Sequence, residues 1–317
     1  MAVIELDHVS KEFTTYRRAG RVRRTRVHTT AVDDVSLTID EGELVGYIGP
    51  NGAGKSTTIK MLTGILLPSS GSVRVAGVDP QRKRMELTRR VGVVFGQRSQ
   101  LWWDLPLRDS FDVLRHVFRV PAARHAENLA TFVDLLELGP LLDRPVRQLS
   151  LGERMRGELT AALLHDPAIL YLDEPTIGLD IVSKTRVREF LAAVNRDRGV
   201  TIVLTTHDLD DVERLCSRLV VIDHGRVVQD STLAEVRRRY APHRTLVVDL
   251  AESWPPLDIA GTEVTRIDGP RQWLRFHRDE HTAAELISQV AATAPLIDIS
   301  VLEPEIEDVI RHVYGVA

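Results

Sequence analysis

The chain of 317 residues has one cysteine, few aromatic residues and no long apolar run. The single Cys216 excludes an internal disulfide and fits a reducing compartment, and its helical surroundings indicate a small buried hydrophobe rather than a nucleophile. The longest apolar runs, such as 219–222, are far shorter than the ~20 residues that span a bilayer. A basic and then apolar leader is also missing, so the sequence predicts a protein that stays in the cytosol.

Charge of one sign is not in excess either. A net charge of -4 with 43% hydrophobic residues is typical of an ordinary globular protein and argues against general nucleic-acid affinity. Within residues 17–26, however, there are six arginines and no acid. A solvated loop is the favoured interpretation, and a contact with anionic lipid headgroups is the alternative. These arginines are Arg17, Arg18, Arg21, Arg23, Arg24 and Arg26.

Residues 49–57, GPNGAGKST, match the phosphate-binding loop G-x-x-x-x-G-K-[ST]. An apolar run at 44–48 precedes them as a predicted strand, and a predicted helix follows. Glycines let successive N–H groups turn inward as an anion nest at a helix N-terminus, so the motif predicts nucleoside triphosphate binding with Mg²⁺. Lys55 is expected to reach the β and γ phosphates, and Ser56 to ligate Mg²⁺. The predicted phosphate-loop residues are Gly49, Asn51, Gly52, Gly54, Lys55, Ser56 and Thr57.

A second motif is the buried strand 169–172, which ends in two acids. Downstream of a phosphate loop, Asp173 is expected to hold Mg²⁺, and Glu174 to orient and deprotonate the attacking water.

Strands and helices alternate through the first part of the chain, which predicts a parallel sheet. We expect a first domain over 1–238 that contains a mostly helical insert at about 98–165. After residue 238 the pattern changes to strands near 246–248, 263–267, 273–276 and 296–301, with a helix capped by Thr282 and a final helix from Ile306. Residues 239–317 therefore read as a small α+β accessory domain.

The motifs occur in an order that resembles the nucleotide-binding subunit of an ATP-binding cassette (ABC) transporter, over residues 1 to about 238. Beyond the phosphate loop and the acid pair, the resemblance is carried by Gln97, by the signature-like segment 149–153 (LSLGE), by 178–180 (GLD) and by His207. It implies a P-loop NTPase cassette with a mostly parallel α/β core, an antiparallel β part and a helical subdomain.

The resemblance also implies roles for these residues. Gln97 would touch Mg²⁺ and the lytic water, and His207 would hydrogen-bond the γ-phosphate. Ser150 and Gly152 would bind the γ-phosphate held by the opposite protomer, and Asp180 would belong to the loop that links two protomers. Two signature positions depart from the family, because Leu151 replaces a glycine and Glu153 a glutamine.

Aromatic residues give two further expectations. Phe13 is the candidate for stacking on adenine, with Tyr16 as the alternative and a core phenylalanine as the plain interpretation. Trp102 and Trp103 follow Gln97, where the family's membrane subunit inserts a helix, and either an interface or packing in the helical insert accounts for them.

The sequence thus predicts an ATPase that dimerises, as a homodimer or with a similar ATPase, around two Mg-ATP. It would drive export through separate membrane permease subunits at the cytoplasmic face of the plasma membrane, without binding nucleic acid. The export direction rests on the tail 302–310, which is similar to that of exporter cassettes. The alternatives are a soluble ABC-type ATPase acting on ribosomes or DNA, and a nucleotide-binding regulator without turnover.

Overall fold

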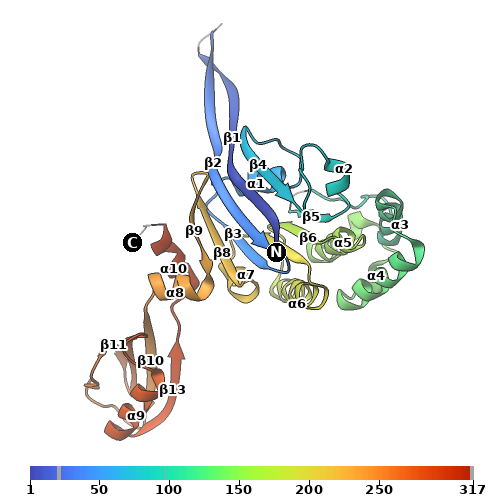
Figure 1. The fold of residues 1–317 in the computed structure, drawn as a ribbon. Coiled ribbons are helices and arrows are strands. Elements are labelled where there is room, and N and C mark those ends of the chain that lie inside the picture. Colours follow the sequence, from blue (N-terminus) through green and yellow to red (C-terminus); the bar gives the residue numbers. More distant parts are fainter. Residues whose placement is uncertain (20–22, 97, 315–317) are drawn as a thin grey trace. The chain divides into compact units, whose positions relative to one another are not determined.

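The computed structural model describes residues 1–19, 23–96 and 98–314, which divide into two compact units (Figure 1). The first unit is Met1–Ser231 and the second is Thr232–Ala317. Helix α8 (Leu233–Tyr240) belongs to the second unit, whereas the sequence places a boundary after residue 238. No helix of the described residues combines the length and apolar character needed to cross a bilayer.

The core of the first unit is a six-stranded sheet. Its central strands pair in parallel, as the alternation of strands and helices predicts, and β3 is buried at every residue. Parallel strands covered on both faces have such continuous apolar runs. In spatial order the strands are β5 (Val91–Phe95), β6 (Ile169–Asp173), β7 (Thr201–Thr205), β3 (Leu44–Ile48), β8 (Arg218–Asp223) and β9 (Arg226–Thr232).

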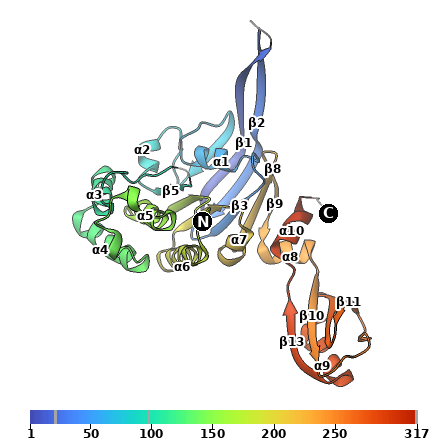
Figure 2. The same ribbon diagram turned by 180° about the vertical axis from the view of Figure 1, so that it is seen from behind.

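A separate antiparallel sheet has the order β2 (Arg23–Asp40), β1 (Ala2–Ala19), β4 (Ser70–Val75). Strand β4 pairs with β1 only as far as Ser10, and beyond it β1 and β2 continue alone as a projecting two-stranded ribbon (Figures 1 and 2). The loop interpretation of the arginine-rich segment is therefore wrong for the described backbone, where Arg18 lies opposite Arg24. Arg21 lies outside the described residues, as do the side chains of 16–25, including Tyr16.

Helices pack around the parallel sheet. Three of them, α3, α4 and α5, lie together and form the predicted helical subdomain (Figure 1). This confirms the P-loop cassette fold. The helices of the first unit are α1 (Lys55–Leu62), α2 (Arg84–Leu87), α3 (Leu107–Phe118), α4 (Ala122–Leu135), α5 (Leu151–Leu163), α6 (Ile181–Arg198) and α7 (Leu209–Leu215). Short 3-10 turns at Gly139–Leu141 and Val146–Gln148 join α4 to α5.

The second unit is a four-stranded antiparallel sheet with the order β11, β12, β10, β13. Helix α9 (Ala283–Thr293) packs on it through Leu286 and Val290, and the predicted capping box of Thr282 and Glu285 is present. The remaining elements are β10 (His243–Leu250), β11 (Thr262–Asp268), β12 (Arg271–His277), β13 (Leu296–Leu302) and α10 (Ile306–Val313).

Candidate active site

The phosphate-binding loop connects β3 to α1. Gly52 and Gly54 have φ angles of 85° and 109°, which only glycine adopts readily. A Cβ on Gly49 would lie 2.3 Å from the carbonyl oxygen of Ile222, and one on Gly54 would lie 2.3 Å from that of Ala31. The glycines of the motif are therefore required by backbone shape and by close packing.

Lys55 is buried, with 7% of its surface exposed. Its Nζ donates to the carbonyl oxygens of Gly49 at 2.5 Å and Pro50 at 3.1 Å, within its own loop. Burial lowers the pKa of Lys55, against the attraction of the carboxylates of Glu174 and Asp173. The loop thus holds a cation next to two acids.

Ser56 and Asp173 meet although they belong to different motifs. The Ser56 hydroxyl lies 3.3 and 3.2 Å from the two carboxylate oxygens of Asp173, and Thr205 donates to the same carboxylate at 2.7 Å. A hydroxyl and a carboxylate are ligands that fit Mg²⁺, which usually completes its shell with phosphate oxygens and water. In the described ranges, no group of three or more acid, histidine or cysteine side chains is arranged to hold a metal by itself.

Glu174, the residue after β6, has a φ of 55°. A non-glycine residue in this region carries a cost of about 1–3 kcal/mol that the surrounding structure must offset. The backbone N–H of Glu174 donates to the Thr205 carbonyl oxygen at 2.9 Å, and His207 Nδ1 lies 3.3 Å from Glu174 Oε1. The structure therefore brings together the carboxylate and the imidazole that the sequence singles out.

Ser56, Asp173 and Glu174 border a cavity of about 580 Å³. Gln97 lies outside the described residues, but its neighbours Gly96 and Arg98 both line the cavity. The sequence analysis missed Arg98, whose only signal is its position next to Gln97. The lining residues are Asn51, Ser56, Lys60, Ile65, Phe95, Gly96, Arg98, Asp173, Glu174 and Ile177.

A buried acid supports the segment around His207. Asp211 is fully buried and accepts from Arg188 Nε at 2.5 Å, from the Thr206 hydroxyl at 3.3 Å and from the Thr176 hydroxyl. Asp208 caps α7, and Asp210 and Asp211 lie in its first turn. The deeper role of Asp211 was missed, because spacing alone does not separate a buried first-turn acid from an exposed one.

Ser150 caps the N-terminus of α5. Its hydroxyl accepts from the N–H of Glu153 at 3.2 Å, and the Glu153 carboxylate accepts from the Ser150 N–H at 2.7 Å, which is a capping box. Burial raises the pKa of Glu153, but the bonds from Ser150 and the attraction of Arg144 outweigh it, so the pKa lies below its usual value. Glu153 therefore keeps its negative charge at this helix end.

Gly152 packs tightly against α6, and Gly178 packs against Leu151 of α5. A Cβ on Gly152 would lie 2.5 Å from the Ser183 hydroxyl, and one on Gly178 would lie 3.0 Å from the side chain of Leu151. Asp180 caps α6 by accepting from the N–H of Ser183 at 2.9 Å.

Of the predicted residues, Asn51, Ser56, Asp173 and Glu174 line the cavity, whereas Ser150, Gly152 and Asp180 are not among its described lining residues, nor are Lys55 and His207. Phe13 is not among them either. It lies on β1, 36% exposed, with Lys11 Nζ 5.3 Å from its ring centre. Thr57 is half-buried in the first turn of α1.

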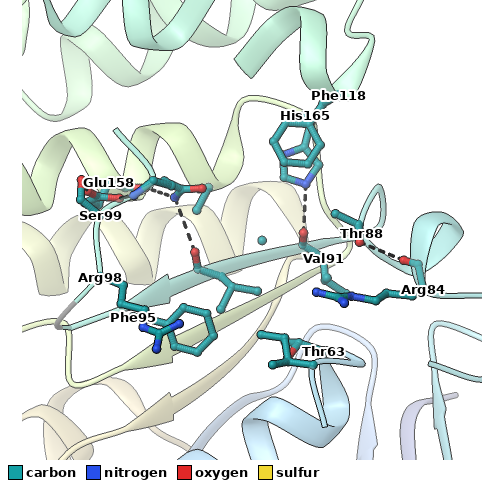
Figure 3. Close-up of a pocket in the computed structure, with 15 residues that line it drawn as sticks. Thr63, Arg84, Thr88, Val91, Phe95, Arg98, Ser99, Phe118, Glu158 and His165 are labelled. Atoms are coloured by element: carbon teal, nitrogen blue, oxygen red, sulfur yellow. Dashed lines mark hydrogen bonds between the residues drawn. The ribbon is translucent and has the colours of Figure 1, made fainter. Parts of the chain in front are cut away.

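A second pocket, of about 240 Å³, lies beside the first cavity (Figure 3). Phe118 stacks on His165 there, and Glu158 lies next to Ser99. Ile65, Phe95 and Arg98 line both cavities and so form a wall between them. Trp102 and Trp103 follow this segment, 40% and 53% exposed, and Arg154 lies 5.8 Å from the Trp103 ring centre.

Comparison with known proteins shows the family of the chain. Residues 32–177 match the family model described as ABC transporter. The methionine import ATP-binding protein MetN of Latilactobacillus sakei subsp. sakei (strain 23K) is 31% identical over 94% of this chain and 89% of its own. The chain belongs to the family of ABC transporter ATP-binding proteins. As a member, it is an ATPase that binds Mg-ATP.

Other relatives of this cassette differ in what their names say they serve. The daunorubicin/doxorubicin resistance ATP-binding protein DrrA of Streptomyces peucetius is 38% identical over 66% of this chain and 63% of its own. Among solved structures, the dimeric, post-hydrolysis state of the cassette MJ0796 with ADP and Pi aligns with a TM-score of 0.61 at 25% identity. That alignment covers 73% of this chain and 98% of that one.

Proposed function

We propose that this cassette dimerises around two Mg-ATP and that each nucleotide is held between residues 49–57 of one protomer and the Ser150 region of the other. The observation that supports this is that Ser56, Asp173 and Glu174 line one cavity, whereas Ser150 caps a helix outside that lining. Ser150 lies at a capped helix N-terminus, a position that favours anions, yet it is not among the lining residues of its own cavity. A second copy would supply it.

Within one site, the roles follow from the contacts. Lys55 supplies a cation beside the phosphates, and Ser56 with Asp173 would hold Mg²⁺, which when bound supplies positive charge against the phosphates. Glu174 is the general base that takes a proton from the attacking water. His207 orients this carboxylate from 3.3 Å.

We propose that the cassette drives export through separate permease subunits. The tail 302–310 and the 38% identity to a protein named for drug resistance support this direction, while the MetN relative is named for import. Mass spectrometry of cells and medium tests it without knowledge of the cargo. In cells that carry Glu174→Gln, an exported compound accumulates inside and falls in the medium, and the reverse pattern would establish import.

We place the permease contact at the pocket of Figure 3 and the adjacent tryptophans, on the cytoplasmic face of the plasma membrane. Half-exposed Trp103 lines a smaller pocket of about 190 Å³, which shares Ser99 and Glu158 with the pocket of Figure 3, and a tryptophan so placed is the kind of anchor that dominates protein interfaces. Affinity capture of Glu174→Gln with Mg-ATP from detergent-solubilised cells tests the partner. Recovery of polytopic membrane proteins is expected, and Trp103→Ala should reduce it while leaving nucleotide binding unchanged.

The same capture tests the alternative. The alternative is a soluble ATPase that acts on ribosomes or DNA. The arginines of the β1–β2 ribbon would then be the residues that bind nucleic-acid phosphates. Stoichiometric recovery of ribosomal proteins or DNA in place of membrane proteins would replace the transporter function with this one.

A further inference from the structure

A buried carboxylate fastens the segment that follows Gln97 to the signature helix. Glu158 lies within α5 and is only 4% exposed. Its Oε2 accepts from the backbone N–H of Gln100 at 3.1 Å, and its Oε1 accepts from the hydroxyl of Ser99 (Figure 3). The Gln100 amide in turn donates to the Glu158 carbonyl oxygen at 3.2 Å.

Packing joins the same segment to the helices. A Cβ on Gly157 would lie 3.1 Å from a methyl carbon of Leu101 and 3.0 Å from one of Leu107, so these side chains press directly on the α5 backbone. The N–H of Trp102 donates to the hydroxyl of Ser110 in α3 at 3.2 Å. Residues 99–102 are therefore held by the helical subdomain from two sides.

The other end of this stretch belongs to the sheet. The N–H of Gly96 donates to the carbonyl oxygen of Asp173 at 2.9 Å, next to the catalytic candidate Glu174. Gly96 thus contacts the acid pair, and residues 99–101 contact α5, which is capped by Ser150.

We propose that Glu158 is a positioning residue, which makes residues 99–102 move together with α5 so that a displacement beside the acid pair reaches Ser150 and the tryptophans. The inference rests on the proposed function, in which Ser150 closes on nucleotide. An apolar residue of similar volume would stabilise α5 at least as well, because burying a carboxylate carries a desolvation cost. Stability alone therefore does not account for an acid at this position.

The chain offers its own reporter. Of its four tryptophans, Trp254 and Trp273 belong to the second unit, so a Trp254→Phe/Trp273→Phe protein reports only on Trp102 and Trp103. In a Glu174→Gln version, Mg-ATP is expected to change the tryptophan emission. Absence of any change in this protein would overturn the inference, since the segment would not respond to nucleotide.

Glu158→Ala should abolish most of this change. With Glu174 intact, it should lower kcat about tenfold and leave the KM for ATP within about twofold. Glu158→Gln should retain both emission change and kcat, because its amide oxygen still accepts from Ser99 or Gln100. Ser99→Ala removes one hydrogen-bond donor, so its emission change and kcat should lie between those of Glu158→Ala and Glu158→Gln. The control is Glu189→Ala, at an exposed position of α6, which should change neither the emission nor kcat.

Two outcomes distinguish an error in the role of Glu158 from an error in the proposed function. Full activity and full emission change in Glu158→Ala, with a wild type that turns over ATP, would overturn the positioning role alone. A folded wild type that hydrolyses no ATP would overturn the proposed function as well. If Glu158→Ala does not fold, Ser99→Ala and Glu158→Gln still decide, because equal loss in both would contradict a role that depends on the accepted hydrogen bonds.

Discussion

The hydroxyl of Ser56 lies 3.2 Å from a carboxylate oxygen of Asp173, although 117 residues separate the two in the chain. The helical subdomain is inserted between them in sequence, yet β6 returns next to the phosphate loop. The parallel sheet fixes this meeting, because the carboxyl ends of its strands share one edge. A phosphate loop without such an acid would bind nucleotide with no protein carboxylate beside the metal.

Replacing the proposed general base should separate binding from turnover. We expect Glu174→Gln to lower kcat roughly 100-fold or more, since general bases typically contribute that much, while nucleotide affinity stays near wild type. His207→Ala should lower kcat less, because His207 acts on the Glu174 carboxylate from 3.3 Å. Single-turnover ATP hydrolysis with a parallel nucleotide titration measures both. Full turnover in Glu174→Gln would remove the base assignment.

Lys55→Ala should act on binding instead. Losing one charged donor to phosphate is worth about 1.5–3 kcal/mol, or roughly a 10- to 100-fold rise in Kd for ATP. Isothermal titration calorimetry checks this, and Lys83→Ala, a lysine 64% exposed beside Glu86, serves as the control. Equal ATP affinities in the two variants would contradict a phosphate role for Lys55.

The signature departure at Glu153 gives a gain-of-function test. Its carboxylate keeps a negative charge near the helix end proposed to meet phosphate, whereas glutamine still accepts from the Ser150 N–H. Glu153→Gln, made in a Glu174→Gln background, should strengthen ATP-dependent dimerisation by about two- to fivefold. Sedimentation velocity across ATP concentrations measures it. Weaker dimerisation would show that the pair with Arg144 matters more than the charge.

The basic ribbon should bind anionic membranes. Each arginine near such a surface contributes about 1 kcal/mol, so removing four should weaken binding to vesicles of anionic phospholipid at least tenfold and flatten its salt dependence. Vesicle co-sedimentation measures the loss. The variant replaces Arg17, Arg18, Arg24 and Arg26 with glutamine. The control makes the same change at exposed Arg82, Arg196, Arg226 and Arg311. Equal losses in the two would refute a specific membrane role for the ribbon.

Glu158 should also change how the stability of the protein depends on pH. Burial raises its pKa from 4.5, so its contribution to stability is fully present below 4.5 and is lost as pH rises through the folded value. Glu158→Gln does not titrate at this position, so the Tm of Glu158→Gln minus the Tm of wild type should increase as the pH rises above 4.5. Thermal denaturation at several pH values checks this. A constant difference would mean that Glu158 titrates alike in the folded and unfolded chain.

The sheet and its catalytic edge could be predicted because each motif carries its own structural pattern. Residues 44–57 read as strand, glycine loop and helix start, and 169–174 read as an apolar strand that ends in acids. These local patterns predict the structure correctly because the central strands are buried on both faces and therefore need continuous apolar runs.

The ribbon and the supporting acids could not be predicted in the same way. Beyond Ser10, the described residues of the two strands pair in the sheet only with each other, so no apolar alternation marks them. Glu158 and Asp211 depend on partners that are distant in sequence, 59 residues away for Ser99 and 23 for Arg188. For Glu158 a signal existed, since it lies among buried Met155, Leu159 and Ala162, where an acid has no place without a partner.

The wall of Ile65, Phe95 and Arg98 has a pharmacological consequence. A small molecule that lodges in the neighbouring pocket, about 240 Å³ in volume, would touch the same three side chains that line the larger cavity without occupying that cavity. Its inhibition would be noncompetitive with ATP. It would therefore keep its strength at the millimolar nucleotide concentrations that blunt compounds directed at the phosphate loop.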